Sequence, residues 1–180
     1  MLGCQGTGDE TMGLDPTRFR TVMGSLAAGV TVVTTCDRHG DPRGLTATAV
    51  CSVSLTPPLI LVCIDRQADC HEAFQEGEAF AVNFLRDDQA QISCHFARKD
   101  ARKFEGIAHR SGVTGAPILT NVLAHVECRI QARYPGGDHT IVVGEAVDSG
   151  VEPLDTAGSP LLHFRGDYAR LESSLPVDAS

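Results

Sequence analysis

The first third of the chain carries three strand-like runs so close together that they limit the possible folds more than any other feature. Residues 30–35 are rich in β-branched side chains, and residues 44–55 resume strand character after a turn at residues 37–41. Two such runs on either side of a short turn predict a β-hairpin. Pro57-Pro58 stops the second run, because proline cannot donate to a strand ladder. The continuous apolar run at residues 59–64 then predicts a central strand that is buried on both faces.

The rest of the chain continues this pattern of short strands and adds few helices. Asp15 before Pro16 is a helix start signal, and Asp69 stands at capping-box spacing from Glu72. Hairpin-like connections between many strands predict a mainly β fold, an antiparallel barrel with short helices, and not a doubly wound sheet. The predicted strands are residues 79–85, 123–134, 140–147 and 161–164, and the predicted helices are residues 15–29, 69–77 and 87–97.

No linker interrupts this pattern, so we expect a single domain. It covers residues 15–172, between a disordered N-terminal tail at residues 1–14 and a C-terminal tail at residues 173–180. No apolar run is long enough to span a bilayer, and the N-terminus lacks the pattern of a secretory signal.

Charge and cysteine content argue against several classes of function. The net charge is −8, so we expect neither nucleic acid nor an anionic membrane surface as a partner, because both require clustered Lys and Arg. The seven cysteines are odd in number and include no C-x-x-C pair, so we expect no metal site and no disulfide framework. Reduced thiols predict a cytoplasmic protein.

The segment at residues 44–55 has an unusual composition for a strand. It alternates small hydroxyl-bearing and small apolar residues over most of its length. Small side chains let a flat ligand approach the backbone, whose polar groups can then meet a ring edge or a phosphate. A tightly packed barrel strand has the same composition, so the residues alone leave both interpretations open. No Gly-x-Gly-x-x-Gly or Walker-type sequence is present, so a nucleotide would need a different cradle.

Two smaller clusters also have two interpretations each. Asp138 and His139 follow a glycine at a predicted turn, where Asp138 could orient the imidazole for a hydrogen bond or a proton transfer. An ordinary hairpin turn explains the same residues. Lys99, Arg102 and Lys103 form a basic group after the predicted helix at residues 87–97, and this group is either solvated surface or a phosphate clamp.

Taken together, these segments resemble the flavin reductase domain family. Its members are the reductase components that serve monooxygenases acting on 4-hydroxyphenylacetate, phenol and similar compounds. The resemblance runs from about Phe19 to Leu171. The motifs that carry it lie at residues 19–35, 44–64, 81–85, 93–97, 103–106, 137–140 and 160–168.

The resemblance implies an FMN-binding split β-barrel, with antiparallel Greek-key-like strands, that forms a homodimer. It implies FMN or FAD as the flavin and NADH or NADPH as the reductant. His139 would be the catalytic residue that meets and positions the nicotinamide. The segment from Phe164 to Tyr168 would close over the site. The implied cofactor-binding residues are Thr46, Ala47, Thr48, Ala49, Ser52, Val53 and Ser54 along one strand, Cys63, Ile64, Asp65, Asp69 and Cys70 on the flavin's other side, His95 and Phe96 at its phosphate or ribityl end, and Asn83, Lys103, His139, Phe164 and Tyr168.

The activity implied is that of an NAD(P)H:flavin oxidoreductase that supplies reduced flavin to a monooxygenase, through a complex or by diffusion. Two alternatives stay open. One is a tightly flavin-bound oxidase of the pyridoxamine-phosphate oxidase type, which shares the barrel, and the other is a non-enzymatic flavin- or haem-binding module. Many relatives carry Asn-Ser or Gln-Ser where this chain has Thr48-Ala49, a departure that bears on flavin affinity and on the choice between FMN and FAD.

Overall fold

A computed structural model describes residues 13–100, 102–151 and 158–171, and within them the fold is mainly β, as predicted. Seven strands form the main sheet, and all neighbouring pairs are antiparallel. Their order across the sheet is β3 (Pro42–Ala47), β2 (Thr31–Cys36), β6 (Ala79–Phe84), β9 (Ala124–Gly136), β10 (His139–Val151), β5 (Pro58–Asp65) and β4 (Val50–Leu55). Apart from residues 13 and 14, the two predicted tails lie outside the described residues.

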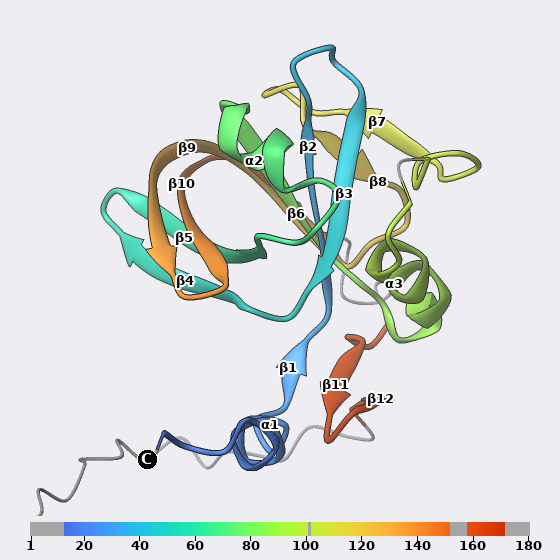
Figure 1. Cartoon of the computed structure of the whole chain (residues 1–180). Helices are drawn as coiled ribbons and strands as arrows, with labels where there is room; N and C mark the ends of the chain where they lie inside the picture. The colour runs from blue at the N-terminus through green and yellow to red at the C-terminus, as the bar shows by residue number, and fades with distance from the viewer. Residues whose placement is uncertain (1–12, 101, 152–157, 172–180) are drawn as a thin grey trace, which may run out of the picture.

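Two small sheets accompany the main one. One contains β1 (Ala28–Gly29), β11 (Leu162–Phe164) and β12 (Asp167–Ala169), and the other is the hairpin of β7 (His109–Ser111) and β8 (Pro117–Leu119). Figure 1 shows β1, β11 and β12 below the main sheet, next to the first helix. The N-terminal and C-terminal parts of the described chain therefore meet in one place.

The main sheet curls, and its two edge strands, β3 and β4, are consecutive in the sequence. Figure 1 shows β9 and β10 bending together around one side of the curl while the chain crosses from β3 to β4. Within the described residues no strand ladder joins β3 to β4. The antiparallel pairing is as predicted, but the sheet does not close into a barrel, because no strand ladder joins β3 and β4 across the crossing at Thr48 and Ala49 within the described residues.

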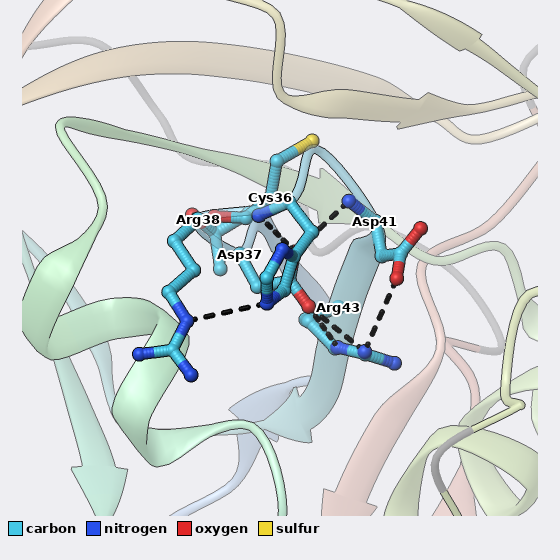
Figure 2. A network of polar contacts seen from close by, with 7 residues as sticks. Cys36, Asp37, Arg38, Asp41 and Arg43 are labelled. Atoms are coloured by element: carbon cyan, nitrogen blue, oxygen red, sulfur yellow. Dashed lines mark hydrogen bonds and ion pairs between the residues drawn. The ribbon is translucent and has the colours of Figure 1, made fainter.

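One carboxylate closes the hairpin of β2 and β3. Oδ1 of Asp37 accepts the N–H groups of His39 at 2.9 Å and Asp41 at 3.0 Å, and its Oδ2 lies 2.8 Å from Nη2 of Arg43 (Figure 2). Gly40 supplies the φ of +84° that the turn requires and that glycine adopts without strain. The hairpin predicted at residues 37–41 is therefore confirmed.

The helices are α1 (Pro16–Met23), α2 (His71–Glu76) and α3 (Ala90–Ala97), the last preceded by the 3-10 turn η1 (Asp87–Gln89). The prediction that the first helix reaches Gly29 is wrong. Gly24 ends the helix, its N–H donating to the carbonyl of Arg20 at 2.8 Å, and Ala28–Gly29 pairs with β11 instead. None of the helices in the described part of the chain is long and apolar enough to cross a bilayer.

The capping role predicted for Asp69 is also wrong. Helix α2 begins after Cys70 with no hydrogen bond from a capping side chain. Asp69 binds Lys103 instead, which is remote in sequence. A long-range ion pair has therefore replaced the local cap that the spacing suggested.

The core lies on the inner face of the curl. Phe74 and Phe80 pack there with Val62 and Ile64 of β5, all fully buried, and a second apolar cluster between β2 and α3 contains Val32, Leu85 and Phe96. The prediction that residues 59–64 are buried on both faces is wrong for the single chain. Alternate side chains of a strand point to opposite faces, and Leu59, Leu61 and Cys63 remain partly exposed on the outer one.

Candidate functional site

The crossing between β3 and β4 presents bare backbone to solvent. Thr48 and Ala49 are both exposed and have short side chains. Within the described residues neither of their N–H groups has a hydrogen-bond acceptor, while the carbonyl of Ala49 accepts the N–H of Cys63 at 3.0 Å. Two unpaired donors beside small side chains give the close approach that a flat ring edge or a phosphate needs. The small-residue segment is thus accessible here, although the preceding Ala47 is only 7% exposed.

A groove of about 420 Å³ includes Thr48 and continues along β4. Its walls are formed by Thr48, Val50, Ser52 and Ile60 together with residues 26–29, Thr31 and Phe84. Val53 is the extra residue of a bulge, since Ser52 pairs with Ile60 and Ser54 pairs with Leu59. Of the predicted residues on this segment, the groove lining includes Thr48 and Ser52. It does not include Thr46, Ala47, Ala49, Val53 and Ser54.

His139 begins β10 and lies opposite Asp65 in the ladder with β5. Its Nδ1 lies 2.7 Å from Oδ1 of Asp138, and its side chain is 41% exposed. This hydrogen bond, together with the charge of the imidazole, holds the pKa of Asp138 below its ordinary value. A carboxylate can only accept, so Nδ1 carries the hydrogen and Nε2 is left to meet a ligand.

Lys103 is a buried residue, not part of a solvated patch. Its Nζ donates to Oδ1 of Asp69 at 2.8 Å and to the carbonyl of Gly44 at 3.2 Å, and the residue is 4% exposed. The other oxygen of Asp69 accepts the N–H of Asp100, and Nε2 of His95 lies 2.7 Å from the carbonyl of Lys103. Because Asp69 neutralises this ammonium inside the fold, Lys103 joins the loop after α3 to β3 and is not a free phosphate clamp.

Tyr168 links the C-terminal hairpin to α3 and β3. Its hydroxyl donates to Oγ of Ser93 at 2.8 Å, and Oγ1 of Thr46 donates to the carbonyl of Ser93 at 2.6 Å. Partial burial, and then the neighbouring Cys94 thiol, raise the pKa of Tyr168. Phe164, on the same hairpin, is 38% exposed. The structure thus connects the predicted residues Thr46 and Tyr168 through the single residue Ser93.

Four of the predicted site residues lie in the core instead. Ile64, Cys70, Asn83 and Phe96 are at most 3% exposed, and burial raises the pKa of the Cys70 thiol to about 11. The Asn83 amide nitrogen donates to the carbonyl of Val32 and to Oγ1 of Thr34, and its oxygen accepts the N–H of Leu119. All polar atoms of this side chain are therefore engaged inside the fold, and the expected ligand contact of Asn83 is replaced by a structural role.

Two features were not predicted from the sequence. One is the groove wall formed by residues 26–29, which were expected to be helical although Gly24 is a signal for an earlier helix end. The other is Glu127, a fully buried carboxylate on β9. No neighbouring residue in the sequence marks Glu127 as buried, because its hydrogen-bond partners belong to the loop between β7 and β8.

His125, Glu127 and Asp148 bring potential metal-ligand atoms within 4.8 Å of one another. The Glu127 oxygens already accept hydrogen bonds from the N–H of Val113 and from the N–H and hydroxyl of Thr114. Nη2 of Arg110 lies 3.1 Å from Nε2 of His125, so a cation would face a guanidinium. We therefore assign Glu127 to anchoring the hairpin of β7 and β8.

Comparisons with known proteins agree on one family. Residues 23–172 match the sequence model described as a flavin reductase like domain. A flavin reductase (NADH) from Kitasatospora aureofaciens is 43% identical over 159 residues, which are 87% of this chain and 82% of that protein. The reductase subunit of a flavin-dependent monooxygenase from Rhodococcus jostii is 37% identical over 166 residues, 92% of this chain and 83% of that protein.

Solved structures give the same result. The NADH:FAD oxidoreductase of Streptomyces globisporus, in complex with NAD and FAD fragments, superposes with a TM-score of 0.79 at 35% sequence identity. The match covers 92% of this chain and 96% of that chain.

Proposed function

The chain belongs to the flavin reductase like domain family, and from this premise we propose that it is an NAD(P)H:flavin oxidoreductase whose reduced FMN or FAD serves a partner monooxygenase. The observation that carries the proposal is the exposed crossing at Thr48 and Ala49, with its two unpaired N–H groups. Free diffusion of the reduced flavin is enough for its transfer to the partner, so no stable complex is required.

The residues at the crossing fit a flavin. An isoalloxazine ring needs a wall without protruding side chains and needs hydrogen-bond donors at its electron-rich edge. Thr48 and Ala49 provide both, whereas the hydroxyl of Thr46 has already donated its hydrogen to Ser93. When bound, the flavin supplies the chemistry, accepting a hydride from the nicotinamide. The N–H groups of Thr48 and Ala49 stabilise the negative charge that this acceptance develops, because they are fixed in place before the reaction.

His139 positions the second substrate. Its Nδ1–H is held by Asp138, which fixes the ring orientation and leaves Nε2 directed toward a ligand. A residue that acts by binding contributes equally to the ground state and the transition state, so its loss raises KM more than it lowers kcat.

Replacing His139 with alanine is expected to raise KM for NADH or NADPH about tenfold, the cost of one lost hydrogen bond, and to leave kcat within about threefold. Steady-state kinetics at saturating flavin measure both constants. His139→Gln keeps a hydrogen-bonding amide and should recover part of the loss. Kinetic constants equal to those of the wild type would remove His139 from the site.

The activity itself is tested by following NADH and NADPH oxidation with FMN, FAD and riboflavin supplied separately. We expect a colourless or weakly coloured protein whose turnover depends on added flavin. A stably yellow protein that oxidises substrate without added flavin would favour the tightly bound oxidase, and the absence of turnover with every pair would contradict the proposal.

We also propose that the curled sheet is a split β-barrel of the FMN-binding type and that two copies pair through its outer face. Val53 and Leu55 of β4 are 50% and 87% exposed, and Val147 of β10 is 44% exposed. Leu59 and Leu61 of β5 are partly exposed on that outer face, and exposed apolar side chains on neighbouring strands favour burial against a second copy. Sedimentation equilibrium should give twice the mass of one chain, and a monomer at micromolar concentration would contradict the pairing.

A further inference from the structure

A second cavity, of about 590 Å³, lies between helix α1 and the hairpin of β11 and β12. Arg20, Thr21 and Ser25 line it from the N-terminal side, and His163 and Arg165 line it from the C-terminal side. Its volume falls within the range of pockets that hold small organic ligands. Arg165 lies in the segment expected to close over the site, but neither it nor the other residues named here line the groove that includes Thr48, so the two cavities are distinct.

The cavity is cationic in an acidic protein. Within the described residues, the guanidinium groups of Arg20 and Arg165 have no ion pair and no hydrogen bond to the protein, although Arg165 lies over the ring of Phe164 at 5.1 Å. No Asp or Glu is among the residues that line the cavity, while the chain as a whole has a net charge of −8. Two arginines that line one cavity are suited to a phosphate, which the planar guanidinium binds through two hydrogen bonds.

The backbone fixes the position of Arg165. Its N–H donates to the carbonyl of Gly24 at 2.8 Å, and its φ of +53° is a left-handed conformation that few side chains other than glycine adopt. The Thr21 hydroxyl donates its hydrogen to the carbonyl of Thr17 at 2.9 Å, and the Ser25 hydroxyl donates to the carbonyl of Thr21 at 3.4 Å. Among the side chains that line the cavity, the arginines and His163 therefore keep hydrogen-bond donors for an anion.

The cavity and the groove at the crossing are lined by consecutive residues of the chain. Gly24 and Ser25 line the cavity, and residues 26–29, which follow directly, line the groove that includes Thr48. A second link runs through side chains: the ring centroids of His163 and Tyr168 lie 6.3 Å apart, the hydroxyl of Tyr168 donates to Ser93, and the carbonyl of Ser93 accepts from Thr46.

We propose that this cavity binds the diphosphate of the ADP half of a dinucleotide, with Arg20 and Arg165 as its phosphate ligands. The proposal rests on the proposed function and extends it by assigning a second subsite. The ADP half is common to FAD and to the reduced nicotinamide dinucleotides, and FMN and the nicotinamide mononucleotide lack it. Loss of the two arginines should therefore weaken the binding of a substrate that carries ADP and leave the binding of FMN and the nicotinamide mononucleotide unchanged.

The first test measures ADP binding to the full-length, flavin-free protein by isothermal titration calorimetry. The Arg20→Ala, Arg165→Ala double variant should bind ADP at least about tenfold more weakly, because two charge-assisted contacts are lost. Arg18→Ala is the matched control, since Arg18 is exposed on the same helix and does not line the cavity. Alanine is a strong helix former, so both helix variants should keep α1, and thermal unfolding checks this. Equal ADP binding by all proteins, or none by the wild type, would overturn the proposal.

The second test assigns the ADP half to its source. If the double variant raises KM for FAD and not for FMN, the cavity holds the flavin. If it raises KM for NADH and not for reduced nicotinamide mononucleotide, the cavity holds the reductant. Unchanged KM values for all four substrates would contradict the subsite. A wild type without flavin-dependent turnover would refute the proposed function, and the calorimetry would still report on the cavity independently.

Discussion

Ala49→Phe is expected to abolish most flavin-dependent oxidation of NADH while leaving the fold intact. Ala49 is exposed at the crossing, so a larger side chain meets no core there. A phenyl ring above the backbone would keep an isoalloxazine from the N–H groups of Thr48 and Ala49. The loss of two hydrogen bonds corresponds to about 3 kcal/mol, or about a hundredfold in kcat/KM for the flavin. Steady-state kinetics with flavin as the varied substrate measure the effect.

The matched control for this variant is Val113→Phe. Val113 is 70% exposed in the loop between β7 and β8, so the substitution adds an exposed aromatic ring away from the crossing. Its kinetic constants should equal those of the wild type. Full activity of Ala49→Phe, with a normal unfolding temperature, would show that the flavin does not lie against this backbone.

Glu127→Gln is expected to lower the free energy of unfolding by about 3 kcal/mol. Glu127 is fully buried, and its carboxylate accepts hydrogen bonds from Val113 and Thr114 on both oxygens. A glutamine amide has one acceptor oxygen and would turn its NH₂ group toward a donor. Urea unfolding measures the change. Glu145→Gln is the control, because the Glu145 carboxylate has a single side-chain hydrogen bond within the described residues, from the exposed Gln131, and its loss should cost less than about 0.5 kcal/mol.

The contribution of Glu127 also depends on pH. Burial by itself raises the pKa of this carboxyl, but hydrogen bonds from Thr114 and Val113 outweigh that effect and hold the pKa below its ordinary value of 4.5. The folded state therefore binds this proton more weakly than the unfolded state does, so the stabilisation is complete above 4.5 and is lost as the pH falls through the folded pKa. The difference in stability between wild type and Glu127→Gln should shrink on acidification, and a constant difference would contradict this assignment.

Local signals in the sequence predicted the elements well. Turn residues at 37–41 and β-branched runs on either side predicted the hairpin of β2 and β3, and Asp15 before Pro16 predicted the start of α1. Both features depend on interactions between residues a few positions apart. Gly24 was a local signal for the end of α1, but the strand that follows at Ala28–Gly29 has no such signal, because its pairing partner β11 lies far along the chain.

The site was only partly predictable, because some of its features depend on sequence neighbours and others on contacts between distant segments. The exposed position of Thr48 and Ala49 agrees with their short side chains, and the contact of Asp138 with His139 joins sequence neighbours. Asn83 and Lys103 have the polar groups that a ligand needs, yet both use them within the fold. Nothing in the adjacent sequence distinguishes these two uses of a polar side chain.

The sequence by itself determined that this chain forms antiparallel strands with few helices, that one segment carries small side chains, and that a histidine follows an aspartate at a turn. Only the tertiary structure decided which of these groups are free to bind. It paired Lys103 with Asp69 and brought Arg20 and Arg165 to one cavity. The physical reason is that strand and turn preferences arise between near neighbours, whereas burial and the partners of a charge depend on which distant segments the folded chain brings together.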